Sequence, residues 1–222
     1  MSKVVILRPE PGASATLARA MAAGIAAVAI PLFEVRPLPW TAPEACDFDA
    51  LLLTSANAVR LGGAELERLN ALPAYCVGEA TAEAARKAGF EISGVGRGGA
   101  AALVLQVPPA LRLLHLAGRE HRPVEGAAAI HVYESRAIDP PPSLAALEGG
   151  VAIVHSPRAG VRLAELVAAR GDISIAAISD TAAAACGTGW REVATIAALG
   201  DGALLALAAA LCQNADMPKK LA

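Results

Sequence analysis

The chain has 222 residues, enough for one large domain or two small ones. A net charge of -2 and an aromatic content of 3% exclude the basic surface and stacking platforms of a nucleic-acid-binding protein. Hydrophobic residues make up 55%, but many are alanine, and the longest apolar run, residues 203–212, is shorter than the ~20 residues of a membrane span. We therefore expect neither nucleic acid nor membrane as a partner.

The N-terminal residues and the cysteines indicate a cytoplasmic location. A run of only four apolar residues precedes Arg8, and no small-residue cleavage site follows, so the start does not look like a signal peptide. The four cysteines, Cys46, Cys76, Cys186 and Cys212, contain no C-x-x-C pair, which argues against disulfides and against a zinc site. We interpret them as small buried hydrophobic residues.

Short apolar runs bounded by turn residues alternate with alanine-rich segments of helical length. This alternation is typical of β-α-β units and predicts an α/β fold with parallel sheets. Ten strands are predicted, at residues 4–7, 27–30, 50–53, 74–77, 91–93, 112–116, 129–133, 151–154, 173–178 and 192–196.

The second half of the chain repeats the first at an offset of about 100 residues. Residues 29–36 match 129–136, and two further matches follow in the same register, 53–57 with 154–158 and 77–82 with 178–182. Each repeat holds two strands, a proline-containing extended connector and three more strands.

The repeat allows two assemblies. Each repeat forms its own lobe, or the connectors cross so that the first two strands join the last three around a contiguous middle lobe. The residue pattern leaves both open.

Loops that follow the strands are the expected place for function, because ligands of open α/β sheets bind beyond the carboxyl ends of the strands. Ser55 and Ser156 each follow a strand and precede a helical segment, as helix N-caps do, and Thr81 and Thr181 are predicted to open the next helices in the same way. Ordinary capping explains these residues equally well. If the four helix termini converge on a cleft, however, they would hold several carboxylates.

Two arginines lie just past strand ends, Arg8 before a proline and Arg119 after Gly118. A guanidinium there is able to grip a carboxylate in a bidentate fork, although a solvated loop charge is the alternative.

Tyr133 has an internal control, because its counterpart in the repeat is Phe33. Packing alone would be satisfied by Phe in both halves, so the hydroxyl suggests a donor of a proton or hydrogen bond. A tyrosine satisfied by nearby backbone is the alternative.

The glycines of residues 94–99 fit the dinucleotide pattern G-x-G-x-x-G. The strand before them is short, the helix after them ends before Pro108, and the next strand lacks the acidic residue expected for ribose, so we do not favour this interpretation. The histidines have no metal-ligand spacing, and no metal site is expected.

Several short sequence segments, taken together, resemble the uroporphyrinogen-III synthase family over nearly the whole chain. They are Arg-Pro at 8–9, Leu-Thr-Ser-Ala-Asn-Ala-Val at 53–59, Val-Gly-Glu-Ala-Thr-Ala at 77–82, Val-Tyr-Glu at 132–134, Ser-Pro at 156–157 and Ile-Ser-Asp-Thr-Ala at 178–182. The chain departs from the family pattern at Leu53, Ser179 and Ala182.

The resemblance implies the crossed assembly, with two similar flavodoxin-like lobes that each contain a parallel sheet of about five strands. The first lobe would hold residues 1–35 and 139–222, the second 36–138, with connectors near 33–43 and 133–142.

The resemblance also implies a lyase reaction without a cofactor. The family converts hydroxymethylbilane, a small linear tetrapyrrole with eight carboxylates, into uroporphyrinogen III, with loss of water and inversion of the last pyrrole through a spiro intermediate. A monomer is expected. Tyr133 would be the proton donor, and the substrate-binding residues would be Arg8, Ser55, Gly78, Thr81, Gly118, Arg119, Ser156 and Thr181. A non-catalytic binding module for a carboxylated ligand and an NAD(P)-dependent oxidoreductase are the alternatives.

Overall fold

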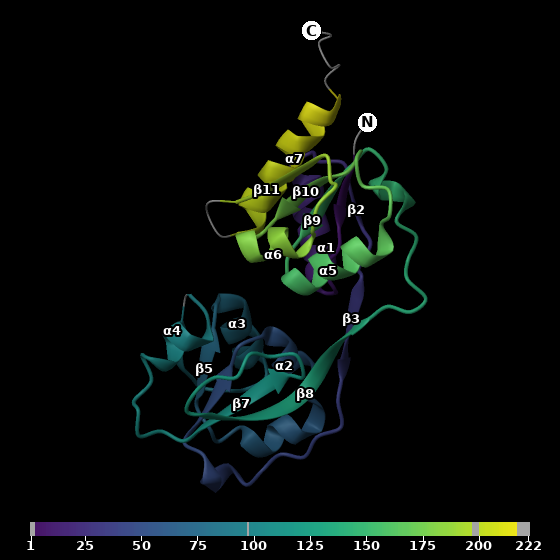
Figure 1. Cartoon of the computed structure of the whole chain (residues 1–222). Helices are drawn as coiled ribbons and strands as arrows, with labels where there is room; N and C mark the ends of the chain where they lie inside the picture. Colours follow the sequence, from purple (N-terminus) through teal and green to yellow (C-terminus); the bar gives the residue numbers. More distant parts are fainter. Residues whose placement is uncertain (1–2, 97, 197–199, 217–222) are drawn as a thin grey trace. The chain divides into compact units, whose positions relative to one another are not determined.

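The computed structural model describes residues 3–96, 98–196 and 200–216 (Figure 1). The chain divides into two compact units. Unit 1 consists of residues 1–34 and 137–222, and unit 2 of residues 35–136.

The sheet of unit 1 has five parallel strands in the order β11-β10-β9-β1-β2. Ile6 pairs with Ala29 on one side and with Ile153 on the other, so β1 lies between β2 and β9. The strands are β1 (Val4–Ile6), β2 (Ala27–Ala29), β9 (Val151–Val154), β10 (Ser174–Ala177) and β11 (Glu192–Thr195).

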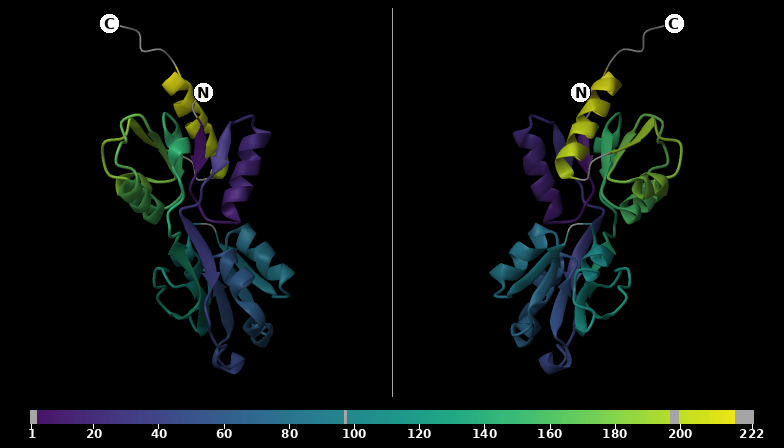
Figure 2. Two further views of the ribbon diagram at one scale, coloured as in Figure 1. Left: turned by 90° about the vertical axis from the view of Figure 1, so that its right-hand side faces the viewer. Right: turned by 90° about the vertical axis from the view of Figure 1, so that its left-hand side faces the viewer.

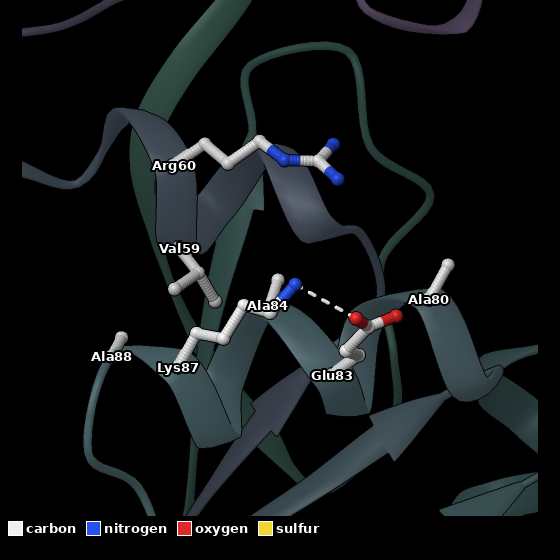
Figure 3. A pocket seen from close by; sticks show the side chains of 7 residues that line it. All are labelled: Val59, Arg60, Ala80, Glu83, Ala84, Lys87 and Ala88. Atoms are coloured by element: carbon white, nitrogen blue, oxygen red, sulfur yellow. Dashed lines mark hydrogen bonds and ion pairs between the residues drawn. The ribbon is translucent and has the colours of Figure 1, made fainter. Parts of the chain in front are cut away.

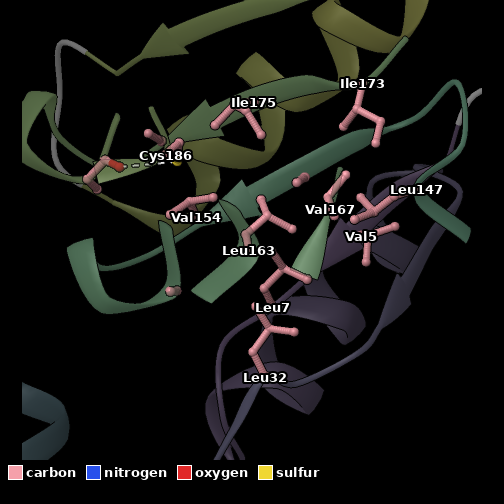
Figure 4. Packing of buried hydrophobic residues seen from close by; sticks show 14 of the residues in the cluster. Val5, Leu7, Leu32, Leu147, Val154, Leu163, Val167, Ile173, Ile175 and Cys186 are labelled. Carbon is pink, nitrogen blue, oxygen red and sulfur yellow. Dashed lines mark hydrogen bonds between the residues drawn. The ribbon is translucent and has the colours of Figure 1, made fainter. Parts of the chain in front are cut away.

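Helices cover both faces of this sheet, because successive side chains of each strand point to opposite faces. Val5 and Leu7 pack against the side of α5 and α6, where Leu163 lies among them (Figure 4). Val4 and Ile6 pack against the side of α1 and α7. The helices are α1 (Gly12–Ala22), α5 (Pro157–Leu166), α6 (Asp180–Ala185) and α7 (Asp201–Asp216), with a 3₁₀ turn η3 (Ala145–Leu147).

The sheet of unit 2 has six strands in the order β3-β8-β7-β4-β5-β6. The strands β4 to β8 are parallel. The backbone N–H of Leu38 donates to Val132 and that of Ile138 donates to Leu32, so β3 runs antiparallel to β8. The strands are β3 (Phe33–Pro37), β4 (Ala50–Leu53), β5 (Ala74–Val77), β6 (Ile92–Gly96), β7 (Leu113–Gly118) and β8 (Ala127–Ala137).

The two faces of this second sheet are covered unequally. Leu51, Leu53 and Leu116 pack under α2 and α3 in the larger cluster. On the other face, Leu113 belongs to a small cluster beside α4. The helices are α2 (Ala56–Leu61), α3 (Glu79–Lys87) and α4 (Ala100–Val104), with the 3₁₀ segments η1 (Ala45–Asp47) and η2 (Gly63–Leu69).

The predicted fold class is confirmed, and the repeat explains the topology. Read as β2-β1-β9-β10-β11 and β8-β7-β4-β5-β6, the five parallel strands of each sheet follow one order, and the matched repeat segments occupy equivalent places. Each of the ten predicted strands is present. The side views in Figure 2 show the same layered arrangement in each unit, a sheet with helices packed on it.

Three sequence predictions were wrong in detail. The sequence predicts an extended connector where β3 lies, because a proline such as Pro37 is typical of connectors, yet the edge of a sheet tolerates it. Cys46 is exposed and Cys212 only half-buried, whereas Cys76 and Cys186 are buried as expected. Gly94 and Gly96 lie within β6 and not in a loop after it, and Arg97 lies outside the described residues.

Gly160 of α5 lies against α6, and replacing it with alanine tests that packing. An added Cβ would lie 2.9 Å from the carbonyl oxygen of Ala182 and 3.0 Å from Cys186 Sγ. Because backbone cannot move aside cheaply, we expect Gly160→Ala to lower the unfolding free energy by about 1–3 kcal/mol in urea titrations. Gly171→Ala, where the added Cβ meets open space, is the control. Equal stability of the two variants would contradict this packing.

Candidate active site

In unit 1, the predicted site residues follow three adjacent strands of the sheet. Arg8 comes after β1, Ser156 after β9 and Thr181 after β10, so all three lie at the carboxyl edge of the sheet. Ser156 caps α5 as predicted, because its Oγ accepts a hydrogen bond from the backbone N–H of Ala159 at 3.2 Å. We call this region the first edge.

The predicted cap at Thr181 is wrong. Ser179 is the N-cap of α6, and its Oγ accepts from the backbone N–H of Ala182. Thr181 is the second residue of the helix, and its hydroxyl lies 3.0 Å from that of Ser179. Sequence spacing missed this because Ser, Asp and Thr in a row all favour a helix start.

In unit 2, the predicted residues lie on or after four adjacent strands, β8, β7, β4 and β5. Ser55 caps α2 by accepting from the backbone N–H of Asn57 at 3.2 Å. Gly118 ends β7, Arg119 follows it, and Tyr133 of β8 pairs with Gly118 in the ladder. We call this region the second edge.

Gly78, not Thr81, is the N-cap of α3. Thr81 is the third helical residue and is buried, so the prediction that it opens the helix was wrong. Gly78 has a φ of 78°, a conformation that favours glycine. Its repeat counterpart, Ser179, is extended and caps with its side chain, whereas Gly78 has no side chain to offer. The helix α3 therefore begins without a side-chain cap.

Tyr133 lies directly over Gly118. A Cβ on Gly118 would be 2.7 Å from the Tyr133 Cζ and 3.0 Å from its hydroxyl oxygen, so only glycine leaves room for the ring. The backbone N–H of Arg119 donates to the Tyr133 carbonyl at 2.9 Å. The Arg119 guanidinium forms an ion pair with Glu134 at 2.6 Å. Three of the predicted residues are thus in direct contact.

The first edge also contains a hydrogen-bond network that the sequence did not reveal. The carboxylate of Asp201, at the start of α7, accepts from His155 Nε2 at 2.9 Å, from Thr16 Oγ1 at 2.7 Å and from Arg19 Nη1 at 2.6 Å. Arg8 Nη1 lies 3.5 Å from the same carboxylate. We call these five residues the Asp201 network.

The network has a defined charge state at neutral pH. Burial raises the pKa of Asp201, but hydrogen bonds from His155 and Thr16 outweigh it and leave the pKa below its ordinary value. Burial lowers the pKa of His155 more than its hydrogen bond to Asp201 raises it. A neutral imidazole therefore donates its Nε2–H to a charged carboxylate.

Three histidines form a cluster in unit 2. The His115 ring lies 5.2 Å from that of His121, which lies 5.0 Å from that of His131. His115 is buried, and its Nε2 hydrogen-bonds to Thr54, which precedes Ser55. Burial, and then the neighbouring His121 and His131, lower the pKa of His115 to about 4. Within the described residues, no group of His, Cys, Asp and Glu side chains has the geometry to hold a metal ion.

Surface hollows occur in both units. One of about 350 Å³ lies between α2 and α3, where Lys87 pairs with Glu83 and Arg60 extends above them (Figure 3). None of its lining residues is a predicted site residue. The other, of about 370 Å³, lies along α5 beside Phe33, and Arg158 covers the Phe33 ring at 4.7 Å from its centroid.

The sequence profile described as uroporphyrinogen-III synthase HemD matches residues 14–201, which is most of the chain. The chain belongs to the uroporphyrinogen-III synthase family. It is therefore a cyclising lyase of tetrapyrrole biosynthesis that acts on a small tetrapyrrole. No curated protein sequence matches the chain significantly.

Solved structures of uroporphyrinogen-III synthases share the fold. The enzyme of Helicobacter pylori 26695 is 18% identical, with a TM-score of 0.67 over 95% of this chain and 100% of that one. A mutant enzyme of the extremely thermophilic bacterium Thermus thermophilus is 16% identical, with a TM-score of 0.54 over 96% of this chain and 100% of that one. In the part of the synthase chain that the structure describes, no helix combines the length and apolarity needed to cross a membrane.

The buried His115 predicts an acid-dependent loss of stability. Its pKa of about 4 in the folded synthase lies below the ordinary value of about 6.5, so the unfolded chain binds the proton more tightly. The stabilisation is complete above pH 6.5 and is lost as the pH falls from 6.5 to 4, by roughly 3 kcal/mol.

Urea unfolding between pH 7.5 and 4.5 measures this loss. His115→Gln keeps a side-chain partner for Thr54 but does not titrate, so its unfolding free energy should fall less with acid than that of the unchanged chain. His155, whose pKa is also lowered, contributes part of the pH dependence of the unfolding free energy in both the variant and the unchanged chain. Identical pH profiles would contradict the assignment.

Proposed function

We propose that the residues of the first and second edges bind the carboxylates of hydroxymethylbilane while the synthase closes it to uroporphyrinogen III. Both edges carry hydrogen-bond donors at the carboxyl ends of parallel strands, where such sheets bind ligands. The observation that supports this most is the contact of Tyr133, within β8, with Gly118 at the end of β7.

The capping serines offer donors for carboxylates. Ser55 and Ser156 use their Oγ lone pairs to accept from helix N–H groups, which leaves each hydroxyl hydrogen to donate. Ser156 also lies at the positive end of α5, and Gly78 at that of α3. Thr181 adds a hydroxyl beside Ser179. Buried Thr81 holds the first turn of α3 rather than the substrate.

The arginines supply positive charge. Arg8 belongs to the Asp201 network, and Arg119 is paired with Glu134. Because the Arg119–Glu134 pair is exposed, it contributes little to stability, and a substrate carboxylate exchanges with Glu134 at small cost. The edges thus attract a polyanion although the chain has a net charge of -2.

Tyr133 is the proposed proton donor to the departing hydroxyl. As the C–O bond of the hydroxymethyl group breaks, electrons from the adjacent pyrrole nitrogen form a C=C bond, and the phenol proton passes to the leaving oxygen to give water. The phenolate recovers its proton when the closed ring loses one. A tyrosine hydroxyl carries the O–H that a proton donor needs. The rest of the catalysis comes from holding the linear tetrapyrrole so that the ring closes at the inverted pyrrole.

We further propose that the synthase acts as a cytoplasmic monomer without a cofactor. The pyrrole nitrogens supply the electrons for the reaction, and the free cysteines are compatible with a reducing compartment. Light scattering of the purified chain measures its oligomeric state.

The decisive assay supplies freshly generated hydroxymethylbilane and separates the product isomers. Enzymatic closure gives the type III isomer, whereas spontaneous closure gives the non-inverted type I isomer. We expect mostly type III. Type I alone, formed at the spontaneous rate, would overturn the proposal.

Replacing Tyr133 by phenylalanine tests the donor role. The ring and its packing on Gly118 remain, so we expect kcat to fall by up to about 100-fold without loss of stability or of type III selectivity. Tyr75→Phe, at the other tyrosine of the chain, is the matched control and should keep full activity. Full activity of Tyr133→Phe would show that the hydroxyl donates no proton.

A further inference from the structure

The position of the Arg8 side chain is set by two residues that the sequence did not single out. Its guanidinium lies across Gly12, the first residue of α1, where a Cβ would be 2.7 Å from Cζ and 2.9 Å from Nη2. Its Nη1 faces the Asp201 carboxylate at 3.5 Å and the Thr16 hydroxyl at 3.4 Å. Gly12 therefore leaves the space that the guanidinium occupies, and Asp201 holds the Nη1 end of it.

The Asp201 carboxylate does not neutralise its surroundings. Two guanidiniums, Arg8 and Arg19, face one carboxylate, and the His155 imidazole is neutral, so these side chains together carry one excess positive charge. Arg19 makes the short contact, at 2.6 Å, and Arg8 the long one. The Asp201 carboxylate therefore bonds mainly to Arg19, Thr16 and His155. It orients the Arg8 guanidinium but leaves much of the positive charge of Arg8 uncompensated.

We propose that Gly12 and Asp201 are positioning residues that hold the Arg8 guanidinium at the first edge to bind a carboxylate of the substrate. This inference rests on the proposed function of the first edge. Arg8 binds the carboxylate directly, and Gly12 and Asp201 act only through Arg8. The site would take one acetate or propionate group of a tetrapyrrole.

Gly12→Ala tests the inference with little effect on folding. The added methyl displaces only the far end of a flexible side chain, and Gly12 has no positive φ, so stability should stay the same or rise slightly. With Arg8 displaced, we expect the Kd for uroporphyrin III, the stable oxidised product with eight carboxylates, to rise about tenfold. KM for hydroxymethylbilane should rise similarly, with a smaller change in kcat. Gly202→Ala, in the first turn of α7 with nothing near the added Cβ, is the matched control.

Asp201→Asn separates positioning from net attraction. Removing the carboxylate makes the network more positive, so attraction by charge alone predicts tighter uroporphyrin III binding. Positioning predicts the opposite, a Kd raised about tenfold, because Arg8 loses its anchor. Thermal unfolding of the same variant measures the structural loss separately. Tighter or unchanged binding by the folded variant would overturn the role of Asp201.

The outcomes also distinguish this inference from the proposed function. Arg8→Gln should weaken uroporphyrin III binding by about 10-fold or more, and unchanged binding by Arg8→Gln or Gly12→Ala overturns the inference even if the chain forms the type III isomer. Failure to form type III overturns the proposed function instead, and the binding titration still reports on Arg8.

Discussion

The burial of both faces of each parallel sheet is the constraint on which the rest of the structure depends. Strands covered by helices on both sides must be apolar at nearly every position, and β4 and β9 are buried throughout. Polar side chains that meet a ligand are therefore restricted mainly to the residues that follow each strand. His115, within β7, departs from this rule, and it has a hydrogen-bonded partner in Thr54 and a pKa far below its ordinary value.

The same constraint explains how much of the fold the sequence could predict. Runs such as 50–53 and 151–154 coincide with observed strands, because complete burial makes them apolar and turn residues mark their ends. The strand β3 was missed because an edge strand needs few ladder bonds and accepts proline, so its sequence looks like a connector. The strand β8 extends beyond the predicted 129–133 to include Glu134, Ser135 and Arg136, whose polar side chains do not signal a strand.

The candidate site was predictable where it depends on strand ends and not where it depends on distant contacts. Ser55 and Ser156 follow strands and Gly118 ends one, so the order along the chain placed them correctly at the two edges, and Tyr133 reaches the second edge because its place in β8 pairs with Gly118. The Asp201 network joins residues 185 positions apart, and no local pattern signals that contact. In the sequence, the position of His155 directly after an apolar strand and before Ser156 is the one local feature that points to this network. The histidine cluster could not be predicted either, because the i, i+4 spacing that marks histidines on one face of a helix does not apply to residues that meet across neighbouring strands.

The repeat separates the features that both units share from those that only one unit has. Both halves keep the strand order and a serine cap after the equivalent strands β4 and β9, because the sheet requires them in each unit. At the matched aromatic position, Phe33 is buried under Arg158, whereas Tyr133 carries a hydroxyl over a glycine that leaves it room. A fold that holds both rings equally well does not need the extra oxygen atom. Its presence in one unit only is the argument for assigning it to the reaction rather than to the core.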